Sequence, residues 1–295
     1  MSDQTPTKSP KTFLADLGLV YAAAIWGSTF LLVKNSLAGI HPVTLVAYRF
    51  LLAALILGIF LLISKKNLLQ DWPKGLLLGT VLFFLYIPQT IGLGITTASN
   101  SAFITGLFIA FIPFLSILIL KRKPRPAQWV AVVISLAGLW LLTGGLTQIN
   151  AGDLITLSAA FTYTCHIMFS DKFISTKIDP YIFAFQQFFV VGLISLMTMF
   201  IFNLDFSVES TYALGSVIFL AVFPSLTAYV IQFKAQQITS PIKVSLIFAL
   251  EPVFGAGIAW TVGREAFIPM QALGGFLIFL SILVSTVEIP SRSTR

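Results

Sequence analysis

Cysteine and histidine are scarce in this 295-residue chain. Cys165 is the only cysteine, so the chain can form neither a disulfide framework nor a thiolate metal site. His41 and His166 are the only histidines, whereas a membrane zinc protease needs two histidines and a glutamate at close helical spacing. We therefore expect no metal ion and no cofactor.

Sequence motifs of other membrane enzymes and of nucleotide-driven pumps are also missing. The chain has no glycine-rich phosphate loop followed by a lysine, which excludes direct nucleotide-driven pumping by this chain. An aspartyl enzyme would need two buried aspartates, but every Asp lies at or beyond the end of a predicted span. The sequence therefore argues against an enzyme.

Charged residues are also scarce, and apolar residues make up most of the chain. Charged residues make up 10% of the chain, 57% of residues are hydrophobic, and the mean hydropathy is +0.94. This composition is typical of a polytopic membrane protein. Runs of about 20 apolar residues predict ten transmembrane helices, with too little chain between them for a soluble catalytic domain. They cover residues 14–34, 42–63, 75–95, 99–120, 127–143, 153–171, 180–202, 212–233, 241–262 and 270–287.

Lysine and arginine are distributed unevenly between the two sides of this topology. Fourteen of the 18 lie in tails and loops on one side, and only Lys34 and Arg264 lie on the other. Because cytoplasmic loops carry the excess of positive charge, we expect both termini to be cytoplasmic. The net charge of +7 then reflects topology, so nucleic acid is not an expected partner.

The two halves of the chain correspond residue by residue and should have opposite orientations. Five spans per half is an odd number, so two joined copies of the unit must lie upside down relative to each other. Inverted repeats of this kind are typical of secondary transporters. The matched positions are Pro42, Arg49 and Phe50 with Pro180, Gln187 and Phe188; Gly79 and Pro88 with Gly215 and Pro224; Ser101 and Pro113 with Ser240 and Pro252. The predicted units are a tail over 1–12, a first repeat over 13–146, a second, inverted repeat over 147–288 and a tail over 289–295.

Four prolines lie inside predicted spans, in two matched pairs: Pro88, Pro113, Pro224 and Pro252. A proline inside a helix removes a backbone donor and clashes with the preceding turn, so we predict a helix break at each. Such breaks are tolerated in a membrane where they face other helices or a cavity. The alternative is that these prolines only kink packed helices.

Glu251 is the one acidic residue that falls deep inside a span, on the order of 15 Å from its start. A carboxyl group at that depth must be paired, hydrated or protonated. It is a candidate for binding a substrate ammonium group or for coupling transport to protons. The alternative is a structural hydrogen bond to a neighbouring helix or to the backbone at Pro252.

Arg49 and Lys243 are the two basic residues inside spans. Arg49 lies about two turns from the outer face, so an anchoring or pairing role is favoured over ligand binding. Whether Arg49 pairs with Glu251 is left open.

Polar and aromatic residues at mid-depth are the other candidates for lining a substrate cavity. Trp26 is followed by Gly27, Ser28 and Thr29, and the equivalent depth of the sixth span holds Tyr163 and His166. Small and hydroxyl residues are also common where membrane helices merely pack, which is the alternative. The complete set of candidates is Trp26, Ser28, Tyr86, Gln89, Asn100, Thr105, Tyr163, His166, Ser225, Tyr229 and Glu251.

Several of these motifs resemble the EamA-type repeat of the drug/metabolite transporter superfamily over residues 13–288. The motifs are Trp26-Gly27-Ser28, Pro42 with Arg49-Phe50, Leu115 through Leu142 with Gln128, Glu251-Pro252-Val253-Phe254, Gly263-Arg264-Glu265, Gln271 and Gly274. The resemblance implies a ten-helix carrier that moves amino acids or related small metabolites, usually outward, across a bacterial inner membrane. It also implies a central cavity lined by spans one, three, four, six, eight and nine, with spans five and ten at the periphery.

We therefore expect an all-α membrane protein with ten transmembrane helices in two inverted repeats, acting as a secondary transporter and exporter by alternating access. Its expected partners are a small-molecule substrate and the lipid bilayer, and it is expected to be a monomer or homodimer. The alternatives are a multidrug or other organic-solute carrier of the same fold, and a channel, scramblase or receptor. Proton coupling, exchange and facilitated diffusion are not distinguished.

Overall fold

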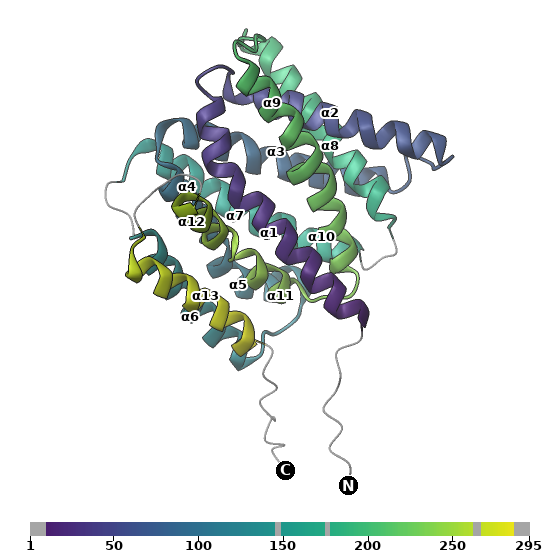
Figure 1. Cartoon of the computed structure of the whole chain (residues 1–295). Helices are drawn as coiled ribbons and strands as arrows, with labels where there is room; N and C mark the ends of the chain where they lie inside the picture. Colours follow the sequence, from purple (N-terminus) through teal and green to yellow (C-terminus); the bar gives the residue numbers. More distant parts are fainter. Residues whose placement is uncertain (1–9, 145–148, 175–177, 262–266, 286–295) are drawn as a thin grey trace.

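The structure is a computed structural model that describes residues 10–144, 149–174, 178–261 and 267–285. Within these ranges the chain is helical, and the only strand-like pairing is an isolated bridge between Ile40 and Val208. The helices, labelled in Figure 1, are α1 (Pro10–Ser36), α2 (Pro42–Ile63), α3 (Trp72–Ile95), α4 (Ala98–Gly106), α5 (Phe108–Leu120), α6 (Pro126–Thr143), α7 (Ala151–Ile174), α8 (Pro180–Ile201), α9 (Thr211–Leu220), the π-helix η1 (Ala221–Thr227), α10 (Ala228–Gln236), α11 (Pro241–Phe248), α12 (Glu251–Thr261) and α13 (Pro269–Ser285). Most of both predicted tails and the Gly263-Arg264-Glu265 motif lie outside the described residues.

These helices correspond to the ten predicted spans, and the prediction of an all-α membrane protein is confirmed. Span four consists of α4 and α5, span eight of α9, η1 and α10, and span nine of α11 and α12. Seven of the spans are long and apolar enough to cross a membrane by themselves, and α6 and α13 are shorter apolar helices. The remaining span, α7, is more polar and buries Asp153, His166 and Asp171 inside the molecule.

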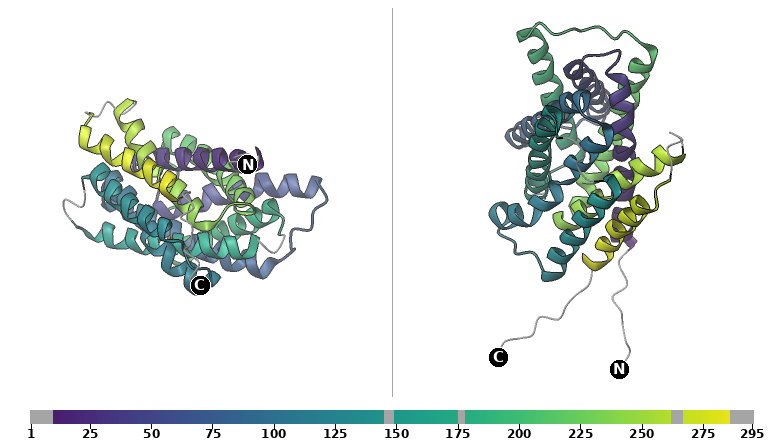
Figure 2. Two further views of the ribbon diagram at one scale, coloured as in Figure 1. Left: turned by 90° about the horizontal axis from the view of Figure 1, so that it is seen from below. Right: turned by 90° about the vertical axis from the view of Figure 1, so that its left-hand side faces the viewer.

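The helices pack in a reciprocal pattern between the two halves of the chain. Spans one and eight pack together as spans six and three do, and spans one and nine pack together as spans six and four do. The second span packs on the seventh (α2 with α8), and the fifth on the tenth (α6 with α13). These last two pairs lie on opposite flanks of the helix bundle (Figure 2). This pattern is the one that two inverted repeats predict, and the inversion itself stays a prediction.

The ends of the described chain and its loops agree with an even number of crossings. The start of α1 and the end of α13 lie at the same end of the molecule (Figure 1). At that end Lys66, in the loop after α2, pairs with Asp179, in the loop before α8, at 3.1 Å. At the other end the Ile40–Val208 bridge joins the loop before α2 to the loop after α8.

Three spans are irregular, but only one of the irregular segments contains a predicted proline. Span eight widens into the π-helix η1, which contains Pro224. Span nine is interrupted at Ala249 and Leu250, and Pro252 is the second residue of the helix that follows. Span four is interrupted at Leu107, six residues before Pro113, which lies inside α5.

The prediction of a helix break at Pro88 is wrong, and so is the placement of a break at Pro113. Pro88 lies inside α3, which continues to Ile95. The carbonyl group that loses its helical donor is that of Phe84, four residues earlier. The hydroxyl of Thr162 on α7 lies 3.2 Å from this carbonyl oxygen, and 3.0 Å from the carbonyl oxygens of Ser158 and Ala159 in its own helix. A neighbouring helix therefore places a hydroxyl group within hydrogen-bond distance of the freed carbonyl oxygen, and α3 is continuous through Pro88.

Candidate functional site

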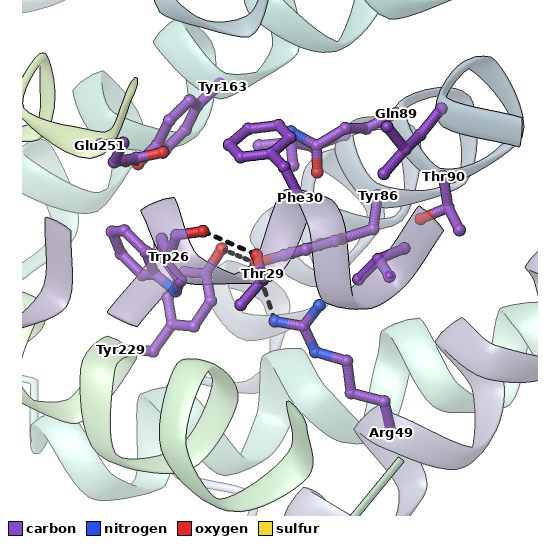
Figure 3. Close-up of a pocket in the computed structure, with 13 residues that line it drawn as sticks. Trp26, Thr29, Phe30, Arg49, Tyr86, Gln89, Thr90, Tyr163, Tyr229 and Glu251 are labelled. Carbon is purple, nitrogen blue, oxygen red and sulfur yellow. Dashed lines mark hydrogen bonds between the residues drawn. The ribbon is translucent and has the colours of Figure 1, made fainter. Parts of the chain in front are cut away.

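A cavity lies at mid-depth where α1, α2, α3, α7, α10 and α12 meet (Figure 3). The space between its lining side chains, including its opening, is about 510 Å³. It extends along the last turns of α1 and α3, toward Val33 and Leu93. The lining residues are Trp26, Thr29, Phe30, Val33, Arg49, Leu85, Tyr86, Gln89, Thr90, Leu93, Tyr163, Tyr229 and Glu251. Six of the eleven candidate residues are therefore brought together in one cavity: Trp26, Tyr86, Gln89, Tyr163, Tyr229 and Glu251.

Arg49 is the centre of a hydrogen-bond network on one side of the cavity. Its Nε donates to the hydroxyl of Ser225 at 2.7 Å, and its Nη2 donates to the hydroxyl of Tyr86 at 3.3 Å. The Tyr86 hydroxyl is also hydrogen-bonded to that of Tyr229, at 2.9 Å. The guanidinium carbon lies 4.5 Å from the ring centroid of Tyr86 and 5.1 Å from that of Phe50. Side chains of α2, α3 and the π-helix η1 thus contact the guanidinium group, and Tyr229 of α10 joins the network through Tyr86.

Glu251 lines the other side of the cavity, apart from Arg49 (Figure 3). Its side chain is buried, and its Oε1 accepts a hydrogen bond from the hydroxyl of Tyr163 at 2.9 Å. No basic side chain lies within 4 Å of it in the described part of the chain. Glu251 and Arg49 therefore line one cavity without forming an ion pair.

The irregular segments of spans eight and nine hold α1 against the cavity. The indole Nε1 of Trp26 donates to the carbonyl oxygen of Pro224 in the π-helix, at 2.7 Å. A Cβ at Gly27 would collide with the carbonyl oxygen of Glu251, so only glycine permits this close approach. The ring of Trp26 packs edge-on against Phe248, with 4.9 Å between ring centroids. These contacts place Trp26 in the cavity wall and Glu251 next to the break in span nine.

Five candidate residues lie outside the cavity lining. Ser225 contacts the site through Arg49, and Thr105 accepts a hydrogen bond from Gln89 at 3.1 Å. His166 is fully buried, with 2.7 Å between its Nε2 and the Oε1 of Gln187. The remaining two lie elsewhere: Asn100 is in the first turn of α4, and Ser28 lines a separate hollow between α1, α4 and α12.

Seven lining residues were not among the sequence candidates, and three of these seven are polar or charged: Thr29, Thr90 and Arg49. Helical spacing is the signal that finds the first two. Residues 26, 29, 30 and 33 of α1 follow the i, i+3, i+4, i+7 pattern of one helix face, and so do residues 86, 89, 90 and 93 of α3. The same spacing excludes Ser28, two positions after Trp26. Arg49 is only 3% exposed and does not extend to the interface as a membrane-anchoring side chain would.

The cavity offers charge and hydroxyl groups rather than metal ligands. Among the described residues, no group of three or more His, Cys, Asp and Glu side chains is close enough to hold a metal ion. The cavity presents one guanidinium, one carboxyl, three tyrosine hydroxyls and an indole face. Such a set of groups can bind a small polar solute by hydrogen bonds and charge.

Comparison with known proteins identifies relatives across the whole chain. The sequence model of the EamA-like transporter family matches twice, over residues 13–144 and 150–287. An uncharacterized transporter of Archaeoglobus fulgidus is 30% identical over 98% of this chain and 91% of its own length. The uncharacterized transporter YyaM of Bacillus subtilis is 26% identical over 91% of this chain and 93% of its own length. A solved crystal structure that is 18% identical has a TM-score of 0.76 and covers 93% of this chain and 96% of that chain, which shows a shared fold.

Proposed function

Because the chain belongs to the EamA-like transporter family and is a membrane transporter rather than an enzyme, we propose that it is a secondary transporter that exports amino acids or related small metabolites. The observation that carries the proposal is the mid-depth cavity with Arg49 and Glu251 in its wall. A buried ionisable group in a membrane protein marks a substrate or ion pathway more often than a structural contact.

Alternating access requires that the cavity open to one side of the membrane at a time. The lining residues extend toward Val33 and Leu93, the side that the charge distribution makes the outer one. Toward the other side, Leu19, Ala22 and Phe233 are fully buried and fill the space between α1 and α10. This arrangement supports an outward-facing carrier in a bacterial inner membrane with both termini in the cytoplasm. We expect the lipid bilayer and the solute to be its only essential partners and the protein to act as a monomer or homodimer.

Glu251 is the proposed coupling residue. Its carboxyl group lines the cavity and has one hydrogen-bond donor, Tyr163, among the described residues. A carboxyl group in this position can take up a proton from the outer side and release it when the cavity opens to the cytoplasm. Proton entry would then drive solute exit.

The experiment that tests this proposal is transport by the purified protein in liposomes. Counterflow with labelled amino acids, nucleosides and organic cations identifies the transported solute. With that solute, we expect an imposed pH gradient to drive flux in the wild type and in E209Q, whose exposed side chain lies in the loop before α9. We expect E251Q to lose this flux while eluting as a folded protein. Gradient-driven flux that is unchanged in E251Q would contradict the coupling role.

Other results of the same experiment would replace the proposal. Counterflow of organic cations but not of amino acids would indicate a multidrug or organic-solute carrier. Flux that does not saturate with solute concentration would indicate a channel.

A further inference from the structure

We propose that Arg49 binds a carboxylate group of the transported solute, so that this carrier selects solutes by an acidic end. The proposal rests on the transport function above and adds to it the chemical class of the solute. It follows from the position of Arg49, its burial, its partners and the geometry of its guanidinium group.

The positive charge of Arg49 has no negative partner among the residues that the structure describes. Its side chain is 3% exposed, and no carboxylate of the described chain lies within 4 Å of it. Its contacts are two hydroxyl groups and two aromatic rings, which orient a guanidinium without neutralising it. A guanidinium keeps its charge in proteins, so the desolvation cost is present whenever the cavity is empty. An anionic ligand would offset that cost.

The guanidinium group retains the donors that such a ligand needs. Arginine has five N–H groups in a planar fork, and the two hydrogen bonds of Arg49 use one on Nε and one on Nη2. The remaining three have no acceptor among the described residues, and the side chain is part of the cavity wall. Two parallel N–H groups match the two oxygens of a carboxylate, and such charge-assisted bonds are about twice as strong as neutral ones.

The surrounding residues hold the guanidinium group of Arg49 in one orientation before the solute binds. Ser225 holds Nε from the second half of the chain, and Tyr86 contacts the guanidinium through both its hydroxyl and its ring. Less side-chain entropy is lost on binding when the recognition group is already immobilised. The opposite wall presents Glu251, so a solute with an amino group at its other end fits the cavity better than a simple acid.

The test compares solutes that differ only at the carboxylate. Proteoliposomes are assayed by counterflow with the twenty L-α-amino acids and, for each one transported, its carboxamide and its decarboxylated amine, with protein-free liposomes to correct for leakage. The variants are R49K and R49Q, with K65Q as the matched control. Lys65 is an exposed cation in the loop after α2, far from the cavity along the chain.

We expect the wild type and K65Q to transport the acid about 10- to 100-fold faster than the amide or amine, the range for losing a hydrogen bond to a charged group. In R49Q the flux of the acid should fall to the level of the amide. R49K should keep part of the preference with a higher KM, because lysine retains the charge and loses the fork. Folding of each variant is checked by its elution profile and melting temperature.

Two results would overturn the inference, and they are distinct. If the wild type transports the amide and the amine as fast as the acid, the carboxylate is not recognised, although the protein is still a transporter of these solutes. This comparison uses only the wild type, so it remains valid even if R49Q misfolds. A wild-type protein that transports none of these solutes removes the proposed amino-acid transport as well.

Discussion

Trp26 is one of the residues through which α1 is hydrogen-bonded to the second half of the chain, together with Tyr21 and Asp16. Its indole N–H donates to the Pro224 carbonyl oxygen, which lies in a π-helical turn where the regular backbone pattern is disrupted. A buried carbonyl oxygen without a donor costs about 1–3 kcal/mol. The contact therefore both positions an aromatic cavity wall and stabilises the widened turn.

We predict that W26F lowers the apparent melting temperature in detergent by at least about 2 °C, because the buried hydrogen bond from the indole to the Pro224 carbonyl oxygen is lost. Its matched control is W140F, since the side chain of Trp140 is 55% exposed on the surface of the protein. W140F should melt like the wild type. Equal melting of W26F and the wild type would show that the Trp26–Pro224 contact contributes no stability.

Residue identity and depth along a span were enough to predict some of the site but not the role of Arg49. Tyr163 and Glu251 were found because aromatic and acidic side chains at mid-span are unusual. For Arg49, sequence depth gave a distance from the interface but not the direction in which the side chain points. That direction depends on Ser225 and Tyr86, which belong to other helices.

At the scale of whole elements, the helix bounds were predictable because long apolar runs separated by short polar segments leave few alternatives. The interruptions within spans were less predictable. A proline removes one hydrogen bond, but the helix can continue where another helix places a donor near the freed carbonyl oxygen, as α7 places the Thr162 hydroxyl near Phe84. Conversely, span four is interrupted at Leu107, where no proline is present.

The contact between α1 and the break in span nine gives the element-scale prediction. A Cβ at Gly27 would overlap the backbone of Glu251, whereas a Cβ at Gly257, which follows Glu251 along α12, meets nothing within 4 Å. We expect G27A to lose about 1–3 kcal/mol of stability and most transport, because backbone atoms must move.

G257A is the control for this prediction. It should be as stable as the wild type or more stable by up to about 1 kcal/mol, since alanine favours a helix over glycine. Thermal unfolding and counterflow are measured on both variants. If G27A and G257A behave alike, the close approach of α1 to Glu251 is not required for transport.

At the scale of the molecule, the distribution of charge and the position of the cavity agree with each other. The excess of lysine and arginine on one side predicts which end is cytoplasmic, and the cavity extends from mid-depth toward the opposite end. Residues of spans two, three and four match residues of spans seven, eight and nine. The contacts between spans repeat under the same correspondence between the two halves. What the sequence alone could not provide is which faces of the helices meet, because this depends on packing between segments far apart in the chain.

The central claim, a solute site in a cavity that opens to one side, is tested most directly by thiol labelling at Thr90, which lines the cavity and is 4% exposed. T90C is made in a C165S background, which removes the only native cysteine, and S64C in the loop after α2 reports orientation. A charged, membrane-impermeant thiol reagent should modify T90C from the outer side, at a rate that saturating transported solute reduces, and S64C only from the cytoplasmic side. Equal labelling of T90C from both sides without protection by solute, or no labelling from either side, would contradict the account.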